Sequence, residues 1–236
     1  EPQSTNTATY SNDFTQGDVF SGSADPNLIG VTLTENQGTA PDGTNNSWLL
    51  KDNNDGSTAT SDLNYFVSNV VSDNFNTFSV FAKKSLTSFL VLQSAGFDSS
   101  GDGFTYFNIE NGTIVSTAAN HTSKIENYGN GWFRCQITNK TTTDLIGSFR
   151  IKWSSNGTSS TITRDGTNGV LLFGVQAEAD ASRNFATSYI PTSGSTVTRN
   201  KDEANNSGDT SLINSTEGVL YAEIAALADD NVARNI

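Results

Sequence analysis

GVLLFGVQAEADASRNFATSYIPTSG, residues 169–194, is the stretch of the sequence that decides the fold. Its apolar beginning, Val170–Phe173 and then Val175 after Gly174, predicts a strand that is buried on both faces. An acidic residue, Glu178, and a polar loop follow, and the stretch closes with aromatic residues and a proline. A chain rarely turns polar directly after its most hydrophobic strand unless a core is complete. We therefore expect one module to end here.

Short segments with alternating side chains precede this stretch, and such alternation predicts β-strands. They cover residues 29–33, 48–50, 63–71, 75–83, 88–95, 104–110, 113–115, 124–128, 132–138 and 148–153. Asn111-Gly112 predicts a hairpin with a type I′ turn, and a further hairpin is expected around Gly129–Gly131. No segment before residue 200 has the pattern of a helix of normal length. Roughly ten strands with short turns predict an all-β fold, an antiparallel β-sandwich.

Several phrases of the sequence are similar to those of a known family. They are YSNDF (10–14), FSVFAK (78–83), NGWFRC (130–135), GVQAE (174–178) and FATSYIPT (185–192). Over residues 10–199 the chain resembles the carbohydrate-binding-type β-sandwich modules of phage tail proteins and related bacterial surface proteins. The resemblance implies a jelly-roll fold, a glycan as partner, and a location in the virion, at the phage tail, or outside the cell.

The two ends of the chain differ in composition from this module. Residues 1–9 are small and polar, which predicts a linker or a loosely held arm. Residues 200–214 have the composition of another linker, and Glu217–Ile224 begins an apolar element that the chain does not complete. That element resembles the first strand of a concanavalin-A-like or laminin-G-like domain, although Ala225–Ala228 also suits a short helix. Since the sequence contains no methionine, we expect it to be part of a longer protein.

Charge and cysteine content exclude several kinds of partner and site. The formal net charge of -12 argues against nucleic acid or an anionic membrane as the main partner, because both need an excess of Lys and Arg. No apolar run approaches the roughly 18 residues of a membrane span. The single cysteine, Cys135, cannot form an internal disulfide, and its place in an alternating strand predicts a buried small hydrophobe.

The alternation of side chains in two strands predicts a sugar-binding sheet face. Each strand has one apolar face and one face with planar or cationic groups, and residues 89–93 could continue that surface. Aromatic rings pack on the apolar face of a sugar ring, and amide, guanidinium and ammonium groups bond to its hydroxyls or carboxylates. The predicted residues are Trp132, Arg134, Gln136, Arg150, Lys152 and Gln93. The alternative is an ordinary solvated face with Arg134 paired to Glu126, and the place of Arg134 in a family phrase favours a structural role.

Aromatic residues beside turns form a second candidate site, because loops at one end of a sandwich often carry binding. They are Trp48, Tyr65, Phe97 and Tyr128, and packing in the core is the alternative for each.

One structural calcium ion is implied by the resemblance, since jelly-roll carbohydrate-binding modules commonly hold one near their first and last strands. The oxygen ligands would come from Asp13 and Glu178, and an ion pair is the other role considered for Glu178. Asp98–Gly103 has the spacing of the start of a calcium loop, although a plain hairpin turn is the better explanation.

Catalytic residues are scarce in this sequence. His121 is the only histidine and lies in a polar segment that predicts a surface position. Glu110, Glu126 and Glu178 could supply carboxylates for glycoside hydrolysis, but no motif singles out a pair. This scarcity argues against an enzyme, and the resemblance implies a non-catalytic module that attaches a phage tail or a secreted protein to a polysaccharide. The Arg and Lys residues of the predicted face favour an acidic polymer. The rivals are a structural spacer in a homotrimeric tail fibre and, as the weakest, a polysaccharide-degrading enzyme.

Overall fold

The computed structural model describes residues 1–16, 27–67, 73–97, 102–142 and 147–203. Contacts divide the chain into two units, Glu1–Lys201 and Asp202–Ile236, and the first unit contains the fold described below. The predicted linker and start of a further domain in residues 200–236 thus lie almost entirely outside the described residues. All the regular secondary structure assigned in the described residues is β-strand.

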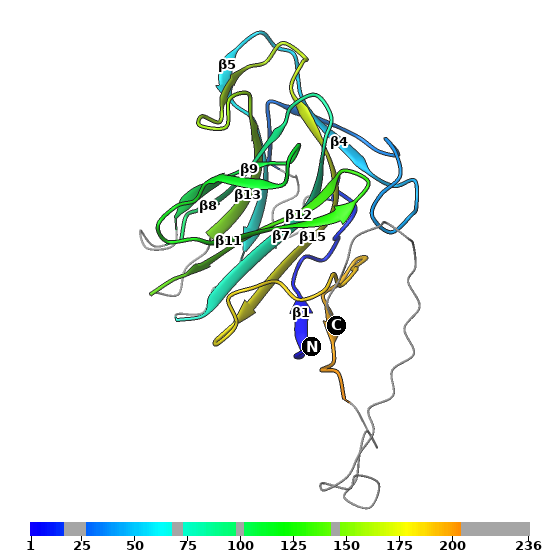
Figure 1. Cartoon of the computed structure of the whole chain (residues 1–236), viewed down its shortest axis with the longest axis vertical. Helices are drawn as coiled ribbons and strands as arrows, with labels where there is room; N and C mark the ends of the chain where they lie inside the picture. Colours follow the sequence, from blue (N-terminus) through cyan, green and yellow to red (C-terminus); the bar gives the residue numbers. More distant parts are fainter. Residues whose placement is uncertain (17–26, 68–72, 98–101, 143–146, 204–236) are drawn as a thin grey trace, which may run out of the picture. The chain divides into compact units, whose positions relative to one another are not determined.

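Two six-stranded antiparallel sheets form a jelly-roll β-sandwich, as the sequence predicted (Figure 1). The β8–β13 sheet has the order β10 (Thr113–Ser116), β9 (Gly103–Asn108), β8 (Phe89–Ala95), β13 (Gly147–Ser154), β6 (Asp62–Val67) and β2 (Asn27–Ile29). The β7–β15 sheet has the order β11 (Thr122–Gly129), β12 (Trp132–Lys140), β7 (Phe75–Lys84), β15 (Gly169–Asp180), β4 (Trp48–Asp52) and β3 (Val31–Thr34). Two small pairs add β1 (Ser4–Asn6) with β16 (Val197–Arg199), and β5 (Thr58–Thr60) with β14 (Thr161–Thr163).

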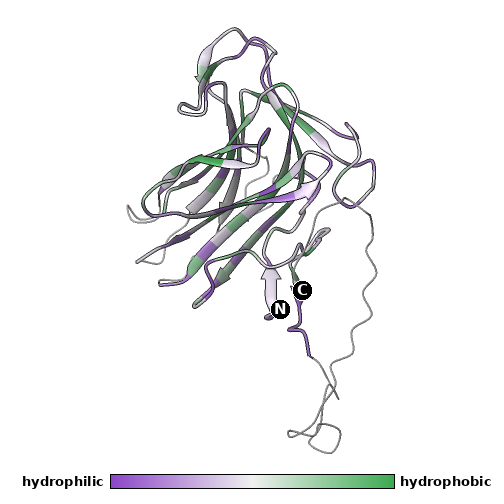
Figure 2. Cartoon of the chain, viewed as in Figure 1, coloured by the Kyte–Doolittle hydropathy of each residue, from purple (hydrophilic) through white to green (hydrophobic). Residues whose placement is uncertain are grey.

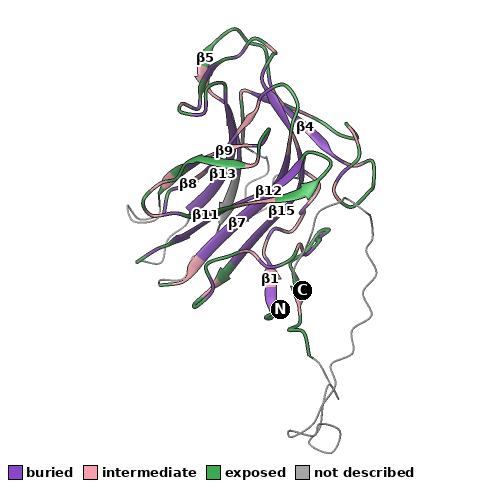
Figure 3. Cartoon of the chain, in the orientation of Figure 1, coloured by how far each residue is buried: buried purple, intermediate pink, exposed green. Residues whose placement is uncertain are grey.

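The main core lies between the two sheets. The strands that enclose it carry hydrophobic positions (Figure 2), and strands such as β7 and β13 are largely buried (Figure 3). Phe78 of β7 stacks on Phe149 of β13 with ring centroids 5.0 Å apart, so this pair joins the sheets directly. Cys135 is buried in this core, as predicted, and Trp153 is buried there as well. Full burial of one such side chain contributes about 1.5–3 kcal/mol, so a core of this kind is sufficient to hold the sandwich together.

Gly30 marks a place where the sequence prediction was wrong. One strand was expected over residues 29–33, but β2 ends at Ile29 in one sheet and β3 begins at Val31 in the other. Gly30 between them has φ +62°, and a Cβ there would lie 2.0 Å from the guanidinium carbon of Arg164. A residue without a side chain is therefore needed where the chain changes sheets.

The turns also differ from the prediction. Asn108 pairs with Thr113, so the predicted hairpin is present but its loop has four residues, and Asn111 has no positive φ. The two-residue turn occurs instead at Asn130-Gly131, where both residues have positive φ (52° and 79°), as a type I′ turn requires.

Residues 1–9 belong to the module, although a linker was predicted for them. The strand β1 pairs with β16, and the backbone of Thr7 bonds to that of Ala177 at 2.9 Å. The side chain of Asn6 is fully buried and donates to the backbone oxygens of Val175 and Ile190. This segment therefore runs along the edge of β15 opposite β7, beyond the residues that pair with β4.

Candidate functional site

The six residues predicted to form one sugar-binding face lie on two different sheets. Trp132, Arg134 and Gln136 are in β12 of the β7–β15 sheet, and their exposed fractions are only 1–2%. Gln93, Arg150 and Lys152 are in the β8–β13 sheet. The prediction of a single open face was wrong, because alternation identifies the face of a strand but not the sheet to which the strand belongs.

Trp132 is covered by the loop that joins β3 to β4. Its indole nitrogen donates to the backbone oxygen of Thr39 at 3.0 Å, and it packs with Ala40, Phe81 and Phe173 in a second apolar cluster. It cannot stack on a sugar in this position.

Arg134 and Gln136 are covered by the segment after β15, residues 181–192. The Arg134 guanidinium donates to the backbone oxygen of Thr187 at 2.6 Å and to Ser79 Oγ at 2.9 and 3.2 Å. It also lies over the ring of Phe81 at 5.4 Å. Gln136 accepts a bond from the backbone of Ala186. Arg134 therefore anchors this segment to the sheet; the expected alternative partner, Glu126, is paired with Lys124 instead.

The Glu178 carboxylate is occupied by protein donors. It accepts bonds from the backbone nitrogen and hydroxyl of Thr187, at 3.0 and 2.7 Å, and from Ser4, and Arg183 lies 3.6 Å away. Of its two predicted roles, ion-pair partner is the one observed. Asp13 accepts bonds from Thr15 within its own turn.

No group of three or more His, Cys, Asp or Glu side chains that could hold a metal occurs among the described residues. The Asp98–Gly103 loop lies largely outside them. A structural calcium ion stays a prediction, and an unchanged melting temperature in chelator and in added calcium would contradict it.

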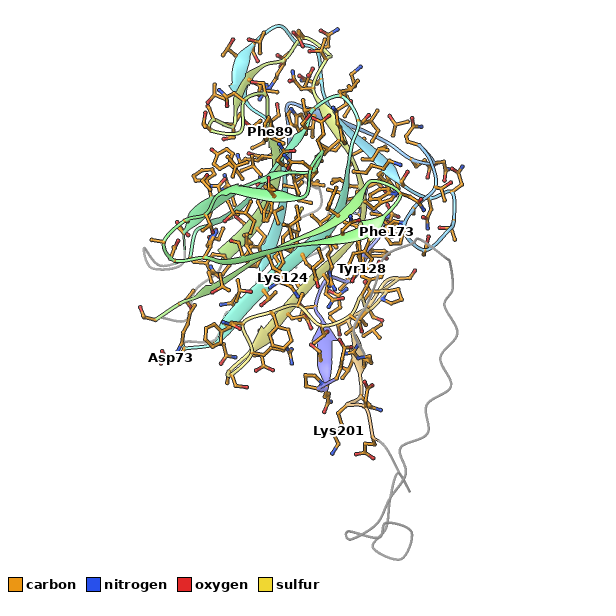
Figure 4. All side chains as sticks on the ribbon, in the orientation of Figure 1. Asp73, Phe89, Lys124, Tyr128, Phe173 and Lys201 are labelled. Carbon is orange, nitrogen blue, oxygen red and sulfur yellow. The ribbon has the colours of Figure 1, made fainter. Side chains whose placement is uncertain are left out.

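The loop aromatics do not form one site. Trp48 is buried against Phe14, and Phe97 against Phe149. Tyr128 is 47% exposed, and its ring meets that of Phe81 edge-on, over the same part of the β7–β15 sheet as Phe173 (Figure 4). The side chain of Tyr65 lies outside the described part.

His121 is buried and not at the surface, contrary to the prediction. Its ring nitrogens lie 2.7 Å from Ser94 Oγ and 3.0 Å from Thr105 Oγ1. Burial lowers the pKa of His121 to about 4, so the ring is neutral at pH 7. Ser94 is completely buried, so no substrate reaches its hydroxyl in this structure.

The outer face of the β8–β13 sheet carries the three predicted residues Gln93, Arg150 and Lys152, together with residues that were not predicted. Cross-strand pairing places them in two rows that each run over β9, β8, β13 and β6. We call Tyr106, Val91, Lys152 and Asp62 the closed row, and Phe104, Gln93, Arg150 and Asn64 the open row. The four strands of each row span three strand spacings, about 14 Å.

The closed row is held by a buried ion pair. Lys152 Nζ lies 2.6 Å from Asp62 Oδ2, and the two side chains are 4% and 2% exposed. Val91 between β9 and β13 is fully buried. Breaking a buried ion pair costs several kcal/mol of folding free energy. The Lys152–Asp62 pair therefore fixes the closed row, which lies beside the open row.

The open row exposes an aromatic ring, an amide and a guanidinium. Phe104 is 40% exposed, and Gln93 and Arg150 are half-buried. Gln93 lies directly between Phe104 and Arg150 in the row, and Asn64 is the neighbour of Arg150 on the other side.

Three buried acceptor atoms in these rows have no hydrogen-bond partner among the residues that the structure describes. They are Gln93 Oε1, Asn64 Oδ1 and Asp62 Oδ1. An unsatisfied buried polar atom costs about 1–3 kcal/mol, and native proteins contain few of them. Their concentration on one sheet face, beside a cation and an exposed ring, is suited to a ligand that supplies several hydroxyl donors.

Sequence reasoning found Gln93, Arg150 and Lys152 but missed Asp62, Asn64 and Phe104. The signal was present in the run Ser61–Tyr65, where polar Asp62 and Asn64 flank the buried Leu63. The alternation shows that these two residues share a face, but not that β6 lies next to β13.

Comparison with known proteins gives only distant similarity. No protein-family model matches the chain, and no curated protein matches it. A solved structure with some likeness is the enzymatically active domain of tailspike protein 4 of bacteriophage CBA120, at 13% identity and a TM-score of 0.37. Another contains the CBM22-1 and GH10 modules of Clostridium thermocellum endo-1,4-β-D-xylanase 10B complexed with xylohexaose, at 13% identity and a TM-score of 0.39.

The matches cover 64% and 79% of this chain, but only 18% and 30% of those two chains. At this level of likeness, neither assigns a site or an activity to the protein. No helix in the described residues is long and apolar enough to cross a membrane.

Proposed function

We propose that the module binds a polysaccharide on the outer face of the β8–β13 sheet, with the polysaccharide lying along the open row. The proposal is supported above all by two acceptors on either side of Arg150, Gln93 Oε1 and Asn64 Oδ1, which have no partner within the described part of the chain. Sugar hydroxyls are donors of the kind that these acceptors require. The exposed ring of Phe104 at the end of the row can pack on the apolar face of a sugar ring.

The proposed module is non-catalytic. Glycoside hydrolysis ordinarily needs two carboxyl groups on either side of the scissile bond. In the two rows the one carboxylate is that of Asp62, and it is held by Lys152. The biological setting in the proposal is the one that the sequence resemblance implies, in which the module holds a phage tail or a secreted protein on a polysaccharide.

Affinity gel electrophoresis tests the proposal with a panel of neutral polysaccharides (dextran, xylan, galactomannan) and acidic ones (alginate, polygalacturonate, hyaluronan). We expect at least one to retard the protein, and Gln93→Ala to abolish most of that retardation. Gln37→Ala, which changes an exposed glutamine after β3, is the matched control and should behave as wild type.

Two results would contradict the proposal. Retardation by none of the polysaccharides would favour the spacer alternative, and release of reducing ends from a retained polymer would favour an enzyme.

A further inference from the structure

The two rows contain three charged side chains, and two of them neutralise each other. Lys152 and Asp62 form a buried pair at 2.6 Å, so neither presents a net charge to a ligand. The third is Arg150, which stands in the open row between Gln93 and Asn64.

Arg150 has no carboxylate partner within 4 Å in the described part of the structure. In that part, its guanidinium makes one hydrogen bond, a long one from Nε to Ser148 Oγ at 3.4 Å. The groups that flank it across the strands are neutral amides, and the acceptor oxygen of each receives no hydrogen bond from any described residue. The terminal nitrogens of the guanidinium are therefore left for a ligand.

This arrangement differs from that of Arg134, the other arginine of the predicted face. Arg134 is 2% exposed, and its guanidinium is used by Ser79 and Thr187. Arg150 is half-buried, so it is partly desolvated but still accessible. A planar guanidinium in such a position matches a carboxylate, with two parallel hydrogen bonds.

We propose that the polysaccharide is acidic and that a carboxylate of one of its sugars binds to Arg150. This inference rests on the proposed function and specifies its ligand. The carboxylate neutralises Arg150, while hydroxyls of the same or the adjacent sugar donate to Gln93 Oε1 and Asn64 Oδ1. A neutral sugar would satisfy the two amide oxygens and leave the cation unpaired. The protein carries a net charge of -12, so attraction of an acidic polymer depends on this local group and not on the whole molecule.

The test compares each acidic polysaccharide that retards the protein with the same polymer after its carboxyl groups have been reduced to alcohols. The dissociation constant is measured for wild type, Arg150→Gln and Arg150→Lys. We expect carboxyl reduction and Arg150→Gln each to weaken binding by about 10- to 100-fold. Arg150→Lys should fall between, because it keeps the charge but not the planar fork.

The losses of affinity from Arg150→Gln and from carboxyl reduction should not be additive. The Arg150→Gln variant should bind the reduced polymer as tightly as wild type binds the reduced polymer. Gln93→Ala should weaken binding of both forms of the polymer.

Three outcomes would overturn the inference. If only neutral polysaccharides are retained and Arg150→Gln binds them normally, the ligand is not acidic but the proposed function stands. If the losses from Arg150→Gln and from carboxyl reduction are additive, the carboxylate binds elsewhere. If no polysaccharide binds, the inference and the proposed function both fail.

Discussion

Arg134 and Arg150 were both predicted to lie on the sugar-binding face, and the structure predicts opposite consequences when each is replaced. We consider Arg134→Met, which keeps the length of the side chain but removes the guanidinium. The charged bonds to Thr187 and Ser79 are lost, together with the contact over Phe81. A hydrogen bond to a charged group contributes about 1.5–3 kcal/mol, so the loss of bonds to two acceptors amounts to roughly 3–6 kcal/mol.

Part of that loss is offset, because folding no longer has to remove a guanidinium from water. We therefore expect a net destabilisation of about 2–4 kcal/mol and a fall in Tm of roughly 5–15 °C for a unit of this size. Urea unfolding followed by tryptophan fluorescence would measure it. Arg150→Met is the matched control, and its free energy of unfolding should stay within about 0.5 kcal/mol of wild type. The reasoning is refuted if Arg134→Met is as stable as wild type, or if the control is equally destabilised.

Three further predictions concern buried polar groups. Asp62→Leu leaves Lys152 unpaired and should cost about 3–5 kcal/mol in urea unfolding, whereas Asp62→Leu with Lys152→Met should recover most of that loss; equal losses in both would contradict the ion pair. Because the pKa of His121 is lowered to about 4 by burial, unfolding takes up a proton between that pH and about 6.5, so stability should fall by up to about 3 kcal/mol as the pH drops through this window. The fall should be smaller in His121→Gln, and parallel pH curves would argue against the assignment. Asn6→Ala removes the acceptor of the Ala177 amide and should cost about 2 kcal/mol or more, whereas an unchanged Tm would mean that the N-terminal segment is a loose arm after all.

Much of the sandwich could be predicted from the sequence, because period-two alternation depends only on neighbouring residues. The strands around Phe78 and Ile151 were placed correctly for this reason, and the strand around Val170 was placed correctly from its apolar run. The cover over the β7–β15 sheet could not be predicted in the same way. Arg134 bonds to Thr187, which lies 53 residues away in sequence. Local alternation around Arg134 is the same whether such a distant segment covers the sheet face or leaves it exposed.

The candidate site was half predicted for a related reason. Alternation placed Arg150 and Lys152 on one face of β13 and Gln93 on one face of β8, and the two strands are indeed neighbours. Asp62 and Asn64 complete the rows only because β6 pairs with the other edge of β13, and this pairing joins residues about 90 positions apart. Long-range strand order, and not the character of the residues, limited the prediction.

Nuclear magnetic resonance would test most directly where the ligand binds. Amide chemical shifts would be recorded while an oligosaccharide, cut from the polysaccharide that retards the protein most strongly, is added. The account predicts that the largest shifts occur in β8, β9, β13 and β6, around Gln93 and Arg150. Shifts concentrated instead in β11 and β12, around Tyr128, would place the ligand on the other sheet and contradict the account.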